Sequence, residues 1–216
     1  TGPGPQFIDQ TAAAGLALET AQMSGWSNAI VDLDADGWKD LFVARSNVID
    51  NIGVFSARKY HEPNSIFRNL GAGRFENVSA AAGPAFHKPE AHRGAAFGDL
   101  DNDGRIDLVV SVLNGRARVF RNTTTPGNHW LMLNLRGTKS NRQGVGASIR
   151  LTTPDGKTQY NHATTSTGYA SSSDPRVYFG LGAATSAKTI EVRWPSGTRQ
   201  VLRDVASNQI LATTEP

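Results

Sequence analysis

Two nine-residue acidic windows carry the residues with the clearest capacity for chemistry. Residues 32–40 and residues 99–107 both follow the pattern Asp-x-Asp-x-Asp-Gly-x-x-Asp. Alternate side chains converge in a tightly coiled turn, and glycine at the sixth position permits the sharp bend. Each window therefore predicts a ring of hard oxygen ligands. The predicted ligands are the four carboxylates and the seventh-position main-chain carbonyl of each window: Asp32, Asp34, Asp36, Asp40 and Trp38 in the first, and Asp99, Asp101, Asp103, Asp107 and Arg105 in the second.

The ligand count and type favour calcium in both windows. Calcium takes about six to eight oxygen ligands, which these groups and a water supply, whereas magnesium gives up its own waters reluctantly. An EF-hand is the main alternative, because the first six positions match its loop. An EF-hand needs a bidentate glutamate at position 12, where this chain has Val43 and Val110. The sequence thus predicts two calcium ions, whose simplest role is to fix a turn.

An internal repeat positions these windows. Phe7-Ile8-Asp9 to Gly15 is echoed by Phe75-Glu76-Asn77 to Gly83, and Ile66-Phe67-Arg68-Asn69 is echoed by Val119-Phe120-Arg121-Asn122. Short apolar segments, rich in β-branched and aromatic residues, flank each window and predict strands. Several strands with an acidic turn between two of them are typical of a propeller blade. We therefore expect two propeller-type blades in residues 1–127.

A different pattern begins near residue 128. Turn motifs such as Pro154-Asp155-Gly156 separate its apolar segments, which favours a second all-β unit of sandwich type over residues 128–216. The predicted fold class is all-β, with a partial propeller of two blades followed by a β-sandwich-like domain. The strand candidates in this part are 130–135, 147–151, 189–194 and 209–212.

Composition and charge exclude several classes of protein. Cysteine is absent, which excludes disulfides, cysteine-based zinc sites and thiol nucleophiles. No apolar run approaches the roughly 18 residues of a membrane-spanning helix. The net charge is +3, but the cations of the basic second part are scattered singly and not interleaved with aromatic residues, so we expect no nucleic-acid partner.

The acidic windows and the second part both resemble known families. Ala96-Phe97-Gly98 and the window that follows it resemble the FG-GAP/VCBS repeat, whose blades carry a calcium loop of this form. Residues 128–216 resemble the ASPIC/UnbV domain, through Asn128-His129-Trp130-Leu131, Gly137 to Ala147, Phe179-Gly180-Leu181-Gly182 and Val192 to Gly197. The combination is similar to bacterial proteins of the cartilage-acidic-protein type. It implies a secreted, periplasmic or cell-surface calcium-binding protein with no agreed enzymatic activity.

Two functional hypotheses follow from the sequence. The first is a non-catalytic binding or scaffold module with a protein partner. Because propellers typically need about four to eight blades, the open blade edges are expected to be covered by the chain's own upstream repeats, by a homo-oligomer or by a larger assembly. The 14-residue excess between Asp40 and Ile66, with Val54 and Phe55, is the place where a partner could bind, unless those side chains pack internally. The alternative is a metal-dependent hydrolase or oxidoreductase, or an accessory subunit, with a transition metal at His61, His87 or His92.

Overall fold

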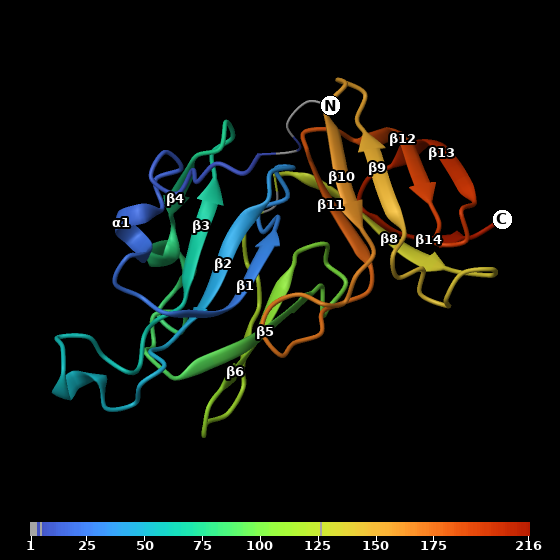
Figure 1. Ribbon diagram of the computed structural model, residues 1–216. Coiled ribbons are helices and arrows are strands. Elements are labelled where there is room, and N and C mark those ends of the chain that lie inside the picture. Colours follow the sequence, from blue (N-terminus) through green and yellow to red (C-terminus); the bar gives the residue numbers. More distant parts are fainter. Residues whose placement is uncertain (1–3, 5, 126) are drawn as a thin grey trace.

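The computed structural model describes residue 4, residues 6–125 and residues 127–216, and it is mostly β-structure (Figure 1). Residues 1–3, 5 and 126 lie outside the described residues. They belong to the predicted first domain, residues 1–127. Two sheets come from residues before 125 and two from residues after 127. These parts are named the repeat region (residues 6–125) and the C-terminal region (residues 127–216). Among the helices that the structure describes, none is long and apolar enough to cross a membrane.

The repeat region consists of two small antiparallel sheets, as expected for two blades. The first sheet has the order β1 (Gly25–Val31), β2 (Asp40–Arg45), β3 (Ser65–Asn69) and β4 (Phe75–Asn77). The second has the order β5 (His92–Gly98), β6 (Asp107–Val112) and β7 (Arg118–Phe120). The helical pieces are short: α1 (Ala17–Thr20), η1 (Ile52–Val54) and η2 (Ser79–Ala82).

Aromatic side chains join the two blades. Phe42 of β2 is fully buried, and its ring lies 5.4 Å from that of Phe97 in β5 and 6.2 Å from that of Phe86, centroid to centroid. Phe86 in turn lies 5.4 Å from Phe120 of β7. All of these pairs are edge-to-face, a favourable geometry for aromatic rings. The blades therefore share one apolar core.

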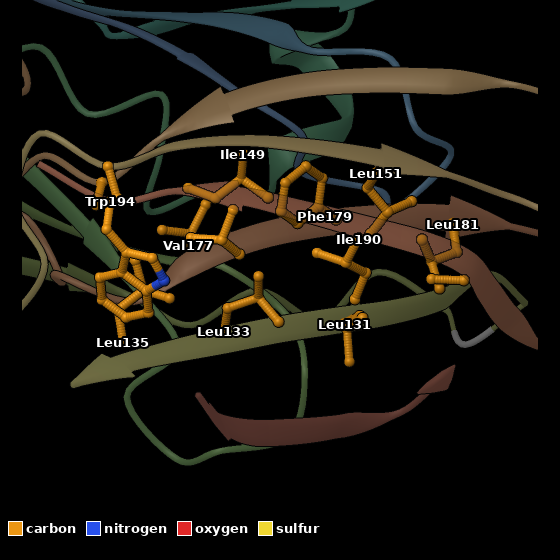
Figure 2. Packing of buried hydrophobic residues seen from close by; sticks show 14 residues of the cluster. Leu131, Leu133, Leu135, Ile149, Leu151, Val177, Phe179, Leu181, Ile190 and Trp194 are labelled. Carbon is orange, nitrogen blue, oxygen red and sulfur yellow. The ribbon is translucent and has the colours of Figure 1, made fainter. Parts of the chain in front are cut away.

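The C-terminal region is a sandwich of two sheets. One sheet has the order β10 (Thr158–His162), β9 (Ser148–Thr152), β12 (Ser186–Arg193) and β13 (Arg199–Ala206). The other has the order β11 (Val177–Gly182), β8 (His129–Arg136) and β14 (Gln209–Thr214), with β14 parallel to β8. Inward-facing residues of both sheets form the core shown in Figure 2, among them Leu131, Leu133, Ile149, Phe179 and Trp194.

Strand β8 contributes to two cores at once. Leu131, Leu133 and Leu135 point into the sandwich. Met132, which alternation places on the opposite face of the strand, is 1% exposed and packs with the aromatic core of the blades. The sheet β11-β8-β14 is therefore covered on both faces.

Glu215 fastens the end of the C-terminal region. Its carboxylate accepts hydrogen bonds from the backbone N–H groups of Thr138, Lys139 and Ser140, at 2.7–2.9 Å, and from the hydroxyls of Ser140 and Ser196. Burial alone would raise the pKa of Glu215, but the hydrogen bonds outweigh it and hold that pKa at about 2.

Glu215→Gln is expected to lower the urea midpoint at pH 7, because the amide cannot accept all of these hydrogen bonds. The folded pKa lies below the ordinary value of 4.5, so the stability that Glu215 contributes is present above about pH 4.5 and is lost as pH falls towards 2. The variant should therefore lose less stability than the wild type between pH 5 and pH 3. Urea unfolding followed by circular dichroism at both pH values measures this. Glu191→Gln, on the outer side of β12, is the control, and equal pH dependence in all three proteins would contradict the role given to Glu215.

Candidate metal centres

The two acidic loops connect the first and second strands of their blades. Val31 pairs with Asp40 at the end of the β1–β2 ladder, and Gly98 pairs with Asp107 at the end of the β5–β6 ladder. The strand ends therefore hold the first and ninth loop positions close together in both copies. The pairing of the flanking strands therefore helps to set the shape of each loop, together with the loop's own sequence.

The two loops have the same backbone conformation. The fourth residue has a positive φ in each, 60° at Ala35 and 59° at Asn102. The sixth residue is a glycine with φ of 85° at Gly37 and 86° at Gly104. Glycine is favoured at the sixth position because residues with a Cβ atom adopt a positive φ only at a cost in conformational energy. The predicted sharp bend is thus present in both windows.

The first aspartate of each loop caps the bend. The Gly37 N–H donates to Asp32 Oδ2 at 2.9 Å, and the Gly104 N–H donates to Asp99 Oδ2 at 2.8 Å. Asp32 is 6% exposed and Asp99 is 2% exposed. Both carboxylates therefore lie inside the loop and not in solvent.

The ninth aspartate ties the loop to the third strand of its blade or to the residues that follow it. Asp40 accepts hydrogen bonds from the N–H groups of Leu33 and Asn69, both at 2.9 Å. Asp107 makes the equivalent bonds with Leu100 at 3.0 Å and Asn122 at 2.7 Å. Sequence reasoning did not assign the two asparagines a role, although the repeated tetrapeptides that end in them were the available indication.

The structure brings three aspartates of each loop into a group that could hold a metal ion. These triads are Asp32, Asp34 and Asp40 in the first loop and Asp99, Asp101 and Asp103 in the second, with one carboxylate oxygen of each residue within 4.8 Å of the others. The other two predicted carboxylates, Asp36 and Asp107, belong to neither triad. Asp36 instead accepts a hydrogen bond from the Trp38 N–H at 2.7 Å.

The side chains of the seventh-position residues serve other contacts. Trp38 is 46% exposed, and Lys157 Nζ lies 4.7 Å from the centre of its ring. Arg105 donates from Nε to the carbonyl of Asn122 at 2.8 Å and pairs with Asp103. Only the main-chain carbonyl of each residue was predicted to serve the metal.

The first loop holds a buried carboxylate whose ionised form is disfavoured and which lacks one hydrogen-bond partner among the described residues. Burial raises the pKa of Asp32 to about 8, opposed by the Gly37 N–H and reinforced by Asp36, and burial also raises the pKa of Asp40 to about 6. Within the described part of the chain, Asp32 Oδ1 has no hydrogen-bond partner. A buried carboxylate oxygen without a donor is costly. A divalent cation beside Asp34 and Asp40 would supply the missing partner, so these residues fit a hard metal ion.

Arginine side chains offset part of the negative charge of the second loop. Arg121 Nη2 lies 2.6 Å from Asp101 Oδ2 and 3.4 Å from Asp103 Oδ2. The equivalent residue of the first copy, Arg68, pairs with Glu76 of β4 at 2.9 Å. The second sheet has no strand in the place of β4 among the residues that the structure describes, and Arg121 faces the loop instead.

The histidines of the transition-metal alternative do not join either triad. His92 is 1% exposed, and its Nδ1 lies 3.2 Å from the Arg45 carbonyl and 3.1 Å from the Glu62 carbonyl. His87 Nε2 lies 3.2 Å from the Ala80 carbonyl. Across residues 4, 6–125 and 127–216, the groups of three or more potential metal ligands consist of aspartates alone.

Comparison with known proteins adds two family matches and a set of partial relatives. Residues 32–110, which contain both acidic loops, match the FG-GAP-like repeat, and residues 137–216 match the family described as ASPIC and UnbV. Cartilage acidic protein 1 of Homo sapiens is 32% identical over 125 residues, covering 56% of this chain and 18% of its own length. The Mus musculus protein of that name is 32% identical over 125 residues, covering 56% of this chain and 19% of its own. The Xenopus tropicalis protein is 34% identical over 65 residues, covering 30% of this chain and 10% of its own.

The chain spans less than a fifth of the length of these curated relatives. The matches confirm the resemblance predicted from the residue motifs, and FG-GAP repeats are propeller blades, in agreement with the two small sheets described above. The chain thus contains an FG-GAP-like repeat followed by an ASPIC and UnbV domain, and it is distantly similar to cartilage acidic protein 1.

Proposed function

We propose that this chain is a calcium-binding, non-catalytic scaffold that acts outside the cytoplasm and binds a protein partner. The buried Oδ1 of Asp32, which has no hydrogen-bond partner among the described residues, carries the calcium-binding part of this proposal. It lies in a triad with Asp34 and Asp40, and the same backbone loop occurs twice. A hard oxygen site of this kind suits calcium better than softer transition metals.

The proposed ligands are those predicted from the sequence, four aspartates and the carbonyl of Trp38 or Arg105 in each loop. The role proposed for calcium is to lock the turn between two blade strands. A metal that binds only the folded state stabilises it by mass action. Each blade has only three or four short strands, so a clamped turn contributes a large share of its order.

The long loop of the first blade supports a protein-binding role. It spans residues 46–64, between β2 and β3. Val54 is 76% exposed, Phe55 is 73% exposed and Val48 is 67% exposed. The exposure of Val54 and Phe55 favours a binding role over the competing interpretation, in which they pack on the second blade or on the C-terminal region. An apolar loop on a rigid blade suits contact with another protein or a second copy of this chain.

The test of the proposal is native mass spectrometry of the chain before and after treatment with a calcium chelator. We expect two calcium ions per wild-type chain. Asp34→Ala and Asp101→Ala should each bind one ion, because each removes one member of one triad. The double variant should bind none.

A stoichiometry of two in both single variants would contradict the assignment of these loops. A bound zinc, copper or iron ion would instead favour the metal-dependent enzyme. The same spectra report the number of chains in the assembly, and a stable oligomer would favour a scaffold formed by copies of this chain.

A further inference from the structure

The acidic loops have an outer face that the C-terminal region covers. Backbone carbonyls of each loop face the C-terminal region and accept hydrogen bonds from it. In the first loop, the carbonyls of three consecutive residues accept hydrogen bonds from the C-terminal region. The donors are Asn128 Nδ2 to Asp34 at 2.9 Å, the Gly182 N–H to Ala35 at 2.9 Å and Lys157 Nζ to Asp36 at 3.0 Å.

The second loop is held in the same manner by different residues. Arg176 donates from Nη2 to the Asp99 carbonyl and from Nη1 to the side-chain oxygen of Asn102, both at 2.7 Å. The hydroxyl of Tyr178 donates to the Gly104 carbonyl at 3.0 Å. One sheet edge therefore contacts both loops, since Tyr178, Gly180 and Gly182 all belong to β11.

Gly180 permits the close approach of β11 to the first loop. A Cβ atom at this position would overlap Asp32 Oδ2 and would lie 2.6 Å from Ala35 Cα. Gly180 does not have the left-handed backbone conformation that requires glycine. Its lack of a side chain therefore serves the contact with the loop and not the shape of its own strand.

The apolar contact behind the loops keeps the two regions together. Met132 is buried in the core of the blades, and Trp130, Tyr178 and Ile210 pack against that core. The hydrogen bonds to the loop carbonyls are thus made at the margin of a packed interface, where small shifts of the loop change their geometry.

We propose that the C-terminal region is a structural part of both metal sites, so that calcium binding inside a loop and packing of β11 against its outer face strengthen each other. This inference rests on the proposed calcium-binding function. The residues concerned position the loops and do not ligate the metal. Linkage requires the effect to be reciprocal: if packing raises calcium affinity, calcium must stabilise the packing by the same factor.

Calcium titration calorimetry of the full chain tests the first direction. Gly180→Ala is expected to weaken the first site by about 5–150-fold, the usual range of coupling between sites, and to leave the second site unchanged. Gly127→Ala is the matched control, because a Cβ atom at Gly127 meets nothing within 4 Å. Asn128→Ala is measured beside it and should weaken the same site, because the Cβ atom of Gly180→Ala also meets the proposed ligand Asp32, whereas the exposed Asn128 side chain donates to the Asp34 carbonyl.

Arg176→Gln distinguishes two effects of Arg176 on the second site. One is positioning of the loop by hydrogen bonds, and the other is repulsion between the guanidinium and the bound calcium ion. Removing a positive charge beside the aspartates would by itself tighten calcium binding. Loss of the hydrogen bonds to Asp99 and Asn102 would instead weaken it, and we expect the weakening. Tighter binding in this variant would overturn the inference for the second loop.

Hydrogen exchange of the wild-type chain, measured by NMR with and without calcium, tests the reverse direction. Calcium should slow exchange of the Gly182 N–H, which donates to the first loop, but not that of the Trp194 N–H, which bonds to Thr198 far from both loops. Wild-type calcium affinity in Asn128→Ala would overturn the inference, as would a Gly182 exchange rate that calcium leaves unchanged. Failure of the wild type to bind calcium would instead refute the proposed function itself.

Discussion

Asp32→Asn is expected to stabilise the chain when calcium is absent and to abolish the stabilisation that calcium provides through the first site. The pKa of Asp32 is raised to about 8 by burial, well above its ordinary value of 3.8. A carboxyl group whose folded pKa is raised stabilises the fold at low pH, and this contribution is lost as pH rises through the folded value. Without metal, the wild type should therefore lose stability between about pH 4 and pH 8.

An amide at residue 32 carries no charge and avoids this loss. Its oxygen can still accept the hydrogen bond from the Gly37 N–H, and its NH₂ group can donate to Asp34 or Asp40. At pH 8 in chelator we expect the variant to exceed the wild type by several kcal/mol, because the pKa of Asp32 is raised from 3.8 to about 8 and a pKa difference of one corresponds to about 1.4 kcal/mol. With calcium at about 100 times its dissociation constant, the wild type gains about 2.7 kcal/mol from the first site and the variant does not.

Urea unfolding at pH 8, with calcium and with chelator, measures both effects. Asp50→Asn is the control, because Asp50 is exposed on the long loop of the first blade and should respond to calcium as the wild type does. A variant that is less stable than the wild type in chelator, or that gains as much from calcium, would show that Asp32 is not a buried ligand.

Phe42→Ala is expected to lower the free energy of unfolding by about 3–5 kcal/mol, the usual cost of removing a buried phenylalanine ring. The ring has no exposed surface and touches the aromatic rings of Phe86 and Phe97. Its removal leaves a cavity in the apolar core that the two blades share. Calcium should recover only part of the loss, because the metal sites lie at the strand ends and not in this core.

Unfolding by urea in calcium-containing buffer measures the loss, and Phe55→Ala provides the comparison. Phe55 is 73% exposed, and exposed positions typically change stability by less than about 0.5 kcal/mol. Equal effects of the two substitutions would contradict the packing described for Phe42.

Much of this fold could be predicted from the repeat and from local patterns. Strands at 29–31, 41–44, 95–97 and 108–110 were predicted beside the acidic windows, and all four lie within the strands observed. Strands β10, β11 and β13 of the C-terminal region were not predicted, and β13 (199–206) shows one reason. It lies at the edge of its sheet and carries Arg199, Arg203 and Asp204, so its pattern is too polar to distinguish it from a loop.

The candidate site was predictable at the level of the loop but not at the level of its surroundings. The spacing of aspartates and the sixth-position glycine depend on local geometry, which neighbouring residues in the sequence determine. The contacts of Asp34 with Asn128 and of Asp99 with Arg176 join residues 94 and 77 positions apart. Such contacts depend on how sheets pack, and no local pattern encodes them. The second-loop pairing of Arg121 was missed for a similar reason, because it depends on a strand present in one blade and not in the other.

The position of β8 affects how the division of this chain into parts should be understood. The change of pattern near residue 128 separates two families of motif, yet the first strand after it supplies Leu131 and Leu133 to one core and Met132 to the other. Cutting the chain there would expose Met132, Trp130 and Ile210 on the sandwich and open the aromatic core of the blades. The border visible in the sequence therefore separates two kinds of motif, while the packing of β8 makes each part depend on the other for a covered core.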